Sequence, residues 1–425
     1  MRAAELKEKI KAGALSAYGT LYADVTAQSE RYLAAIDAFC ELYGDAEDIY
    51  LFSVPGRSEI SGNHTDHQNG RVLAGAIDRD IIAVVSATDN GSIALKSEGY
   101  PEDTVSLDTV SDPDAFKDYS SVSLIAGTCD GFLKRGYKIG GFNAYTTPEV
   151  LKGSGISSSA AFEVMIGNIL NYLYNDGRIA NEELAKIARY AENVYFGKPC
   201  GLMDQMACAV GGFVYIDFKD SLEPVIEPIG FSLTDKGYAL CIVNTGGNHA
   251  DLTPDYAAVP AEMKQIAAYF GKEVLRPVTE QMLIENAPVL RTVASDRALL
   301  RALHFVRENV RVAEQAKALR EDDTDAFLEG VLASGASSFR FLQNVYTTAN
   351  PAEQGLSLAL AVTEGALAGK GCAYRVHGGG FAGTIQAFVK TEYVDAYRAL
   401  MDSIFGDGAT MTLRIRPVGA TEIRL

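Results

Sequence analysis

The strongest restriction on the fold comes from a glycine- and serine-rich segment that passes directly into an apolar helix. The segment reads LKGSGISSSAAFEVMIGNIL, and the helix presents an apolar face that includes Ala161, Val164, Met165 and Ile169. The glycines let backbone amides approach an anion, and the positive end of the helix dipole favours negative charge. The segment is not a Walker loop, because Lys152 precedes the glycines. We therefore predict a phosphate-binding loop, with a flexible connector as the alternative.

The size and charge of the chain exclude several classes of protein. With 425 residues the chain exceeds what one hydrophobic core usually organises, so we expect two domains. A formal net charge of −17 argues against a nucleic-acid partner, because binding a phosphate backbone needs a basic face. An acidic protein that handles an anionic substrate must concentrate positive potential locally, through backbone amides, a few arginines or a bound cation.

The cysteines and the N-terminus indicate a cytoplasmic protein. The closest cysteine pair, Cys200 and Cys208, matches no zinc-binding spacing, so reduced thiols are expected. The N-terminal segment MRAAELKEKI is charged and helical, and no apolar run approaches the length of a membrane span. We expect no membrane contact, and a monomer or a small homo-oligomer.

Hydrophobic periodicity predicts strands and helices without strict alternation, which is typical of α+β proteins. Long helical patterns dominate the chain beyond about residue 219. We therefore predict an N-terminal domain over 1–218 and a C-terminal domain over 219–425. Strands are expected over 49–54, 81–87, 92–97, 142–145, 372–376, 384–389 and 411–416, and helices over 121–133, 256–271, 297–319, 324–346 and 353–369 and from 181 and 393.

The stretch Val54–Gly70 combines an arginine, two histidines, acids and glycines, and it is too polar for a core strand. If it forms an extended loop, His64 and Asp66 lie on the same side. Donors and acceptors gathered on one side suit a polyhydroxylated ligand, and Arg57 precedes them. A surface loop without a ligand is the alternative.

Two further segments carry candidate chemistry. Asp204 follows Gly201 at the expected start of a short apolar helix, where an acid either balances the helix dipole or takes part in chemistry. Glu192 borders the buried stripe of the preceding helix, as a rim charge or as a cation ligand. Near the C-terminus, VHGGGFAGTIQAFV predicts a tight glycine loop before a strand, packed against backbone or against a ligand.

Taken in order, these four segments resemble those of the galactokinase branch of the GHMP small-molecule kinases, over nearly the whole chain. The stretch PGR…SGNHTDHQNG is similar to the sugar-binding signature of the branch, and GSGISSSAA to the phosphate loop of the family. In the same way, GKPCGLMDQ is similar to its catalytic-aspartate segment and HGGGFAG to its C-terminal glycine motif.

The resemblance implies a two-domain GHMP kinase fold of the α+β class. Its N-terminal domain would be mixed α/β with the phosphate loop, its C-terminal domain helix-rich α+β, and its active site would lie in the cleft between them. It also implies an ATP-dependent sugar 1-kinase whose ligands are galactose, ATP and Mg²⁺.

The resemblance further implies roles for individual residues. Asp204 would be the base that faces the anomeric hydroxyl, and Arg57 would neutralise charge on the transferring phosphoryl group. Ser159 and Glu192 would hold Mg²⁺, which takes few protein oxygens. The triphosphate would be bound by Gly153, Ser154, Gly155, Ile156, Ser157, Ser158 and Ser159, and the sugar by Asn63, His64, Asp66, Gly201 and Tyr256.

Asn63 stands where the family signature carries a glutamate, which leaves the sugar preference open. Hydrogen bonds to charged groups are worth about 1.5–3 kcal/mol and neutral ones about 1, so galactose would bind about tenfold more weakly. An amide can also donate to a 6-carboxylate, and DHQNG resembles the corresponding segment of plant galacturonate kinases. Galactose is the expected substrate, with galacturonate and N-acetylgalactosamine as alternatives.

A non-catalytic, galactokinase-like sensor is the alternative from another class of proteins. Such a sensor is expected to lose part of the phosphate loop, the base or the arginine. Both Arg57 and Asp204 are present, as are the two expected metal ligands. Departures from the family pattern concern the sugar side, where Ser58-Glu59-Ile60 replaces a Val-Asn pattern and 332–346 lacks a Ser-His motif. We therefore expect an enzyme.

Overall fold

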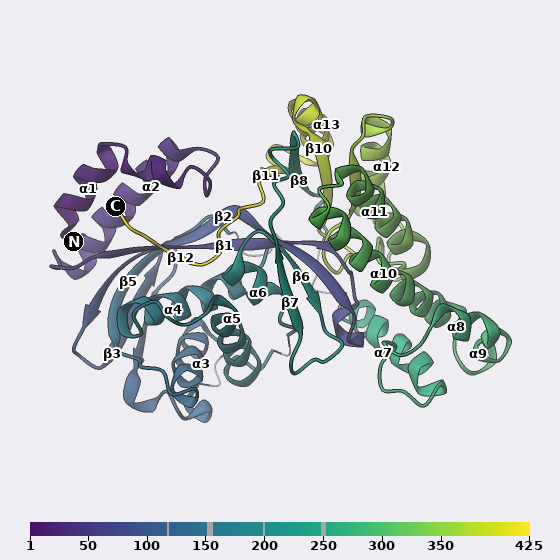
Figure 1. Ribbon diagram of the computed structural model, residues 1–425, viewed down its shortest axis with the longest axis horizontal. Helices are drawn as coiled ribbons and strands as arrows, with labels where there is room; N and C mark the ends of the chain where they lie inside the picture. The colour runs from purple at the N-terminus through teal and green to yellow at the C-terminus, as the bar shows by residue number, and fades with distance from the viewer. Residues whose placement is uncertain (117–118, 151–155, 199, 248–251) are drawn as a thin grey trace. The chain divides into compact units, whose positions relative to one another are not determined.

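The computed structural model describes residues 1–425 except 117–118, 151–155, 199 and 248–251, and the chain forms two compact units (Figure 1). Each unit has its own sheet pairings and cores, and the chain passes between the units several times. Unit 1 comprises Met1–Arg57, Ala76–Gly212 and Arg416–Leu425, and unit 2 comprises Ser58–Gly75 and Phe213–Ile415.

These units differ from the predicted division into 1–218 and 219–425 in three segments, 58–75, 213–218 and 416–425. Residues 58–75 belong to unit 2, where the first part of β2 (Arg71–Thr88) pairs with β6 (Phe213–Asp217). The C-terminal segment returns to unit 1, because β12 (Thr421–Ile423) pairs antiparallel with the start of β1 (Tyr50–Ser61). Both pairings join residues far apart in the sequence, so local periodicity does not mark them.

Unit 1 is built on a mixed sheet in the order β12-β1-β2-β5-β3-β4, covered by helices on both faces (Figure 1). Successive side chains of β1 point to opposite faces of the sheet, so Leu51 lies in the core formed with α1 and α2. Phe52, on the other face, packs on Tyr172 of α4, with 5.9 Å between ring centroids. The remaining elements are α1 (Ala3–Lys11), α2 (Val25–Tyr43), β3 (Ser92–Ser97), β4 (Glu102–Ser106), α3 (Ser121–Lys134), β5 (Gly141–Pro148), α4 (Ser158–Tyr174), α5 (Asn181–Tyr190) and α6 (Met203–Val210).

Unit 2 contains the pairing of β6 with β7 and a separate sheet in the order β11-β8-β10-β9. One core gathers residues of α7 to α10, and another packs α12 and α13 on the separate sheet. The remaining elements are β7 (Val225–Ile229), β8 (Tyr238–Asn244), α7 (Thr253–Tyr269), α8 (Glu280–Glu285), α9 (Ala287–Val293), α10 (Asp296–Arg320), α11 (Thr324–Ser337), α12 (Gly355–Leu367), β9 (Ala373–Val376), β10 (Thr384–Lys390), α13 (Val394–Phe405) and β11 (Thr410–Leu413).

The polar stretch at Val54 begins as a strand, so the prediction of a loop there was wrong as far as Ser61, where β1 ends. Ser58 and Ser61 are buried, and both hydroxyls have partners in unit 2. Ser58 Oγ lies 3.1 Å from His377 Nε2, and Ser61 Oγ donates to Glu308 Oε1 at 3.1 Å. A core strand tolerates polar side chains when each one finds a hydrogen-bond partner.

Local patterns located most long elements and missed short ones. The expected helix over 121–133 is α3, and the expected strand over 92–97 is β3. The expected helix over 324–346 is shorter, because α11 gives way to a π-helical turn at Ser338–Leu342. Within the described ranges, no helix is both long and apolar enough to cross a membrane.

Candidate active site

Arg57 and Asp204 form a two-pronged ion pair in unit 1. Arg57 Nε donates to Asp204 Oδ1 at 2.7 Å, and Nη2 donates to Oδ2 at 2.8 Å. The arginine lies on β1 and the aspartate in the first turn of α6, 147 residues later in the sequence. A guanidinium that matches both carboxylate oxygens fixes the orientation of each group.

The end of the glycine–serine segment makes a further contact with the Arg57–Asp204 pair. Ser157 Oγ donates to Asp204 Oδ2, and the backbone of Ser157 adopts the left-handed region with φ of 59°. A non-glycine residue in that region stores strain that the surrounding contacts must hold. The backbone N–H of Arg57 also donates to Ile156 O at 3.2 Å. The strand, the helix start and the segment before α4 are therefore held against one another.

Gly56 allows this close approach. A Cβ atom at position 56 would meet Ile156 O at 2.7 Å and the side chain of Val150 at 3.1 Å. At such distances a residue larger than glycine would fit at position 56 only if the backbone shifted. Gly56, the glycine of the Pro-Gly-Arg sequence, therefore allows β1 to pack closely against the segment that precedes α4.

The electrostatic environment keeps Asp204 ionised. Burial opposes ionisation, but the charge and hydrogen bonds of Arg57, together with Ser157, outweigh it and hold the pKa of Asp204 below its usual range. The side chain of Asp204 remains 34% exposed. An ionised carboxylate that keeps access to solvent is able to receive a ligand.

A second polar cluster in unit 1 centres on Glu192, which lies in a π-helical turn over Ala191–Tyr195 and is almost fully buried. Ser159 Oγ lies 3.5 Å from Glu192 Oε1, and Lys198 Nζ lies 2.9 Å from the same oxygen. Gln205 Nε2 donates to Glu192 Oε2 at 2.7 Å and to Glu163 Oε2 at 3.2 Å. The amide thus bridges two buried carboxyl groups.

The donor set of this cluster fits Mg²⁺. Ser159 and Glu192 offer two hard oxygens 3.5 Å apart, and neighbouring ligands of an octahedral Mg²⁺ lie about 3 Å apart. Lys198 already places a cation on the carboxylate. In the described ranges, no three His, Cys, Asp or Glu residues gather to hold a metal alone.

The structure describes only some of the other residues expected at the phosphate loop. Gly153, Ser154 and Gly155 lie outside the described residues. Ile156 is buried, and Ser158 is the first residue of α4.

On the sugar side, three expected residues converge on the glycine motif within unit 2. The amide Nδ2 of Asn63 donates to Gly378 O. His64 Nε2 lies 2.9 Å from Gly379 O, and Tyr256 OH donates to Gly380 O at 2.7 Å. Three consecutive carbonyls are thus held by three side chains from two distant segments. The glycine loop therefore contacts protein side chains through its backbone.

Asn63 is fully buried, and its contacts are with protein groups. Its Oδ1 lies 3.5 Å from Ser338 Oγ, and its backbone O lies 3.1 Å from His304 Nε2. Burial lowers the pKa of His304 to about 4, so the ring is neutral. Since a carbonyl only accepts, Nε2 carries the proton and Nδ1 accepts from Ser337 Oγ.

The last two expected sugar contacts lie apart from this group in the chain. Asp66 begins a short 3₁₀ turn, where its Oδ1 accepts from the backbone N–H of His67 at 2.8 Å. Gly201 is exposed in unit 1, just before α6. Among the described residues, neither Asp66 nor Gly201 forms a hydrogen bond with the glycine motif.

Replacing Asn63 with aspartate should destabilise the protein by about 3 kcal/mol. The substitution keeps the shape but removes the donor to Gly378 O and buries a carboxylate against a carbonyl, which costs more than an ordinary lost bond. Denaturant unfolding measures the loss. It should shrink at low pH, where the protonated carboxyl of the variant can donate again.

Asn350→Asp is the matched control, because Asn350 is exposed in a loop of the same unit. It should change the free energy of unfolding by less than about 0.5 kcal/mol. Equal stability of the two variants would show that the bond to the glycine loop contributes little.

Sequence reasoning did not identify several residues that shape these groups. Glu163, Gln205 and Lys198 surround the expected metal ligand, and His304 holds the backbone of Asn63. Glu163, Gln205 and Lys198 lie within the quoted segments, close to Ser159 and Asp204 in the sequence, so their positions were a usable signal. His304 is an isolated histidine in a helical pattern, and nothing local distinguishes it.

Two family models match segments that contain most of these residues. The model of the GHMP kinases N-terminal domain matches residues 123–212, which include the segment before α4 and Asp204. The model of the galactokinase galactose-binding signature matches residues 37–87, which include Arg57 and Asn63. The two matched regions therefore contain both polar groups of unit 1 and the start of the sugar-side group.

Individual relatives extend the similarity over most of the chain. A galactokinase of Streptomyces coelicolor is 31% identical over 89% of this chain and 94% of its own length. One from Pyrococcus furiosus is 33% identical over 64% of this chain and 72% of its own. The crystal structure of Lactococcus lactis galactokinase complexed with galactose shares the fold, with a TM-score of 0.76 at 24% identity, covering 92% of this chain and all of that one. The chain therefore belongs to the galactokinase family of GHMP kinases and is a phosphotransferase.

Proposed function

We propose that the chain is an ATP-dependent kinase that phosphorylates the anomeric hydroxyl of galactose. The observation that carries this proposal is the two-pronged pair of Arg57 and Asp204, held by Ser157 from the segment expected to bind phosphate. A phosphoryl transfer to a hydroxyl needs a carboxylate for the proton and a cation for the phosphoryl charge. The pair supplies both within one hydrogen-bonded group.

Asp204 would accept the proton of the sugar hydroxyl late in the reaction. Because Arg57 holds the pKa of Asp204 low, the carboxylate is a weak base and does not deprotonate a free hydroxyl. In a loose transition state, the hydroxyl becomes acidic only as its oxygen bonds to phosphorus. Until then Asp204 orients the hydroxyl, and Arg57 offers its charge to the phosphoryl oxygens.

Ser159 and Glu192 would hold Mg²⁺, and Gln205 would keep the carboxylate of Glu192 in place. When bound, Mg²⁺ supplies charge neutralisation on the phosphates of ATP. Burial, with the charge of Glu192, raises the pKa of Glu163 well above its usual range, so Glu163 adds little negative charge beside the metal ligand. Lys198 would balance Glu192 before the metal arrives.

The environment of Asn63 bears on the choice of sugar. Its donor is engaged by Gly378 O, so a 6-carboxylate would have to compete for it. This supports galactose over galacturonate, with Asn63 as a positioning residue for the glycine loop. The intact bonding of Arg57, Asp204 and Glu192 supports catalysis over a sensor role.

The proposal is tested by following ADP release with Mg·ATP and a panel of galactose, galacturonate, N-acetylgalactosamine and glucose. We expect galactose to be turned over fastest. A clear preference for galacturonate or N-acetylgalactosamine would replace the proposed substrate. No turnover of any sugar, with sugar and ATP both bound, would instead indicate a sensor.

A further inference from the structure

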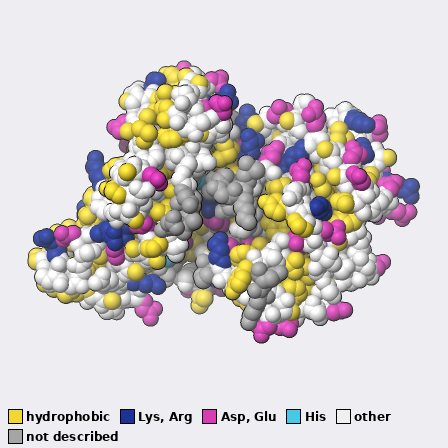
Figure 2. Space-filling view, turned by 180° about the vertical axis from the view of Figure 1, so that it is seen from behind, with side chains coloured by type: hydrophobic (Ala, Val, Ile, Leu, Met, Phe, Trp, Pro, Cys, Tyr) yellow, Lys and Arg dark blue, Asp and Glu magenta, His cyan; other side chains and the backbone are white. Residues whose placement is uncertain are grey.

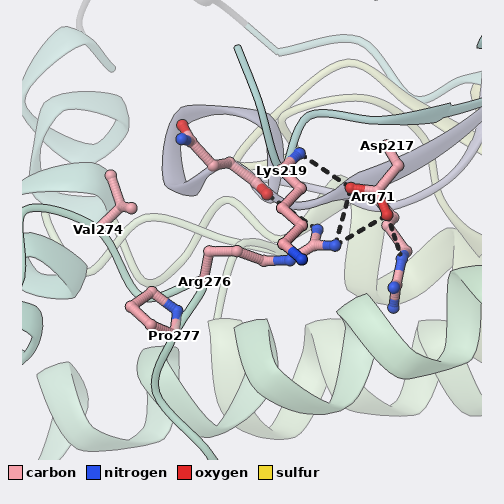
Figure 3. Close-up of a pocket in the computed structure, with 7 residues that line it drawn as sticks. Arg71, Asp217, Lys219, Val274, Arg276 and Pro277 are labelled. Atoms are coloured by element: carbon pink, nitrogen blue, oxygen red, sulfur yellow. Dashed lines mark hydrogen bonds and ion pairs between the residues drawn. The ribbon is translucent and has the colours of Figure 1, made fainter. Parts of the chain in front are cut away.

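Unit 2 carries a surface cavity of about 690 Å³ whose lining residues have no assigned role in the kinase chemistry. Figure 3 shows it beside Arg71, Lys219 and Arg276, with Val274 and Pro277 on its apolar side. The volume lies in the range of small-molecule sites. No residue expected to bind ATP, the sugar or Mg²⁺ lines this cavity.

The two arginines are held in place by one carboxylate. Arg71 Nε donates to Asp217 Oδ2 at 2.8 Å, and Arg276 Nη2 donates to the same oxygen at 2.8 Å. Arg276 Nη1 also donates to Asn69 O at 2.9 Å and to Asn309 Oδ1 at 3.1 Å. Guanidinium groups fixed in this way lose little freedom when a ligand binds.

The cavity keeps a positive charge after these contacts. Burial opposes ionisation of Asp217, but hydrogen bonds from Arg276 and Arg71 hold the pKa of its carboxyl below its usual range. One carboxylate therefore faces three cations, because Lys219 adds an exposed ammonium. In the part of the chain that the structure describes, that ammonium has no acidic partner.

A positive cavity stands out on this protein. The chain has a formal net charge of −17, and on the face shown in Figure 2 lysine and arginine side chains lie among aspartates and glutamates. Such a background repels anions except where basic groups are concentrated. Two arginines and a lysine at one cavity match the donors with which proteins bind phosphate groups.

We propose that this cavity binds a small phosphate-bearing molecule, with the phosphate group at Arg71, Lys219 and Arg276 and any organic part against Val274 and Pro277. None of its lining residues is among those assigned to the substrates of the proposed kinase reaction. Inorganic phosphate and phosphate esters share this chemistry, so the experiment distinguishes them.

The test is calorimetric titration of the full chain with inorganic phosphate, glucose 1-phosphate and AMP at constant ionic strength. We compare wild type with Lys219→Glu and with Lys317→Glu, a charge reversal at an exposed lysine of α10 outside the cavity. Reversing the charge at 219 should weaken binding of at least one probe about tenfold, because a phosphate dianion then faces a carboxylate. The Lys317 variant should bind as wild type does.

Each outcome decides the proposal. If Lys219→Glu weakens the binding of inorganic phosphate and of both esters equally, the cavity recognises the phosphate group alone. If the substitution weakens the binding of an ester only, the apolar side of the cavity contributes to binding. Unchanged affinity in the Lys219 variant, or no saturable binding by wild type at millimolar concentrations, would overturn the proposal. Sugar-kinase activity should be the same in wild type and both variants, so this result is independent of the proposed function.

Discussion

Asp204→Asn is expected to lower the turnover number with galactose by about 10²- to 10⁴-fold, the usual contribution of a positioned proton acceptor. Asparagine keeps the shape of the side chain but cannot accept the proton, and it leaves Arg57 without its ionic partner. Turnover by ADP release measures the loss. Because the pKa of Asp204 is held low, wild-type activity should show no loss from protonation of Asp204 until the pH falls below about 4.

Asp176→Asn is the matched control, since Asp176 is an exposed residue of unit 1 and asparagine also tolerates its left-handed backbone. Its turnover should equal that of wild type. Circular dichroism and binding of ATP should show that the Asp204 variant remains folded. A loss smaller than about tenfold in that variant would assign Asp204 a role in orientation alone.

Asp80→Asn is expected to destabilise the protein by about 4 kcal/mol, because it breaks a buried ionic network by removing one charge. Asp80 is fully buried in unit 1, where its oxygens accept from Arg31 Nη1 at 2.7 Å and Arg416 Nη1 at 3.2 Å. Ser53 and Tyr22 also donate to it. The variant would remove the carboxylate of Asp80 from both guanidinium groups, and among the described residues only Arg31 would keep another one nearby, Glu149 at 3.7 Å. Denaturant unfolding would report the cost.

The pH dependence of that cost has a definite sign. Burial opposes ionisation of Asp80, but Arg31 and Arg416 outweigh it and hold its pKa below the usual range. Its stabilising contribution is therefore complete above the unfolded pKa of about 4 and is lost as the pH falls through the folded pKa. The difference between wild type and variant should narrow in acid.

The control for this network is Asp48→Asn, which removes an exposed pair with the N-terminal amine of Met1. Exposed pairs contribute about 1 kcal/mol or less. A similarly small effect at Asp80 would show that the buried network does not anchor the C-terminal segment to unit 1.

Local sequence patterns were sufficient to select the residues of the candidate site. Arg57, Asp204, Ser159 and Glu192 were identified from short motifs, and the structure places them in two neighbouring polar clusters of unit 1. Motifs carry this information because backbone amides, acids and arginines have similar uses wherever they recur. They carried no information on His304, whose role depends on Asn63, 241 residues away in the chain.

By itself the sequence determined the family, the α+β class, most long helices and which residues carry charge at the site. Those features depend on periodicity and short motifs, which act over a few residues. Only the tertiary structure decided that β1 continues through Ser58, that Asn63 holds Gly378, and that Arg416 returns to Asp80. Each of these depends on which polar groups meet when distant segments are buried together, because a buried donor or acceptor must find a partner wherever the fold supplies one.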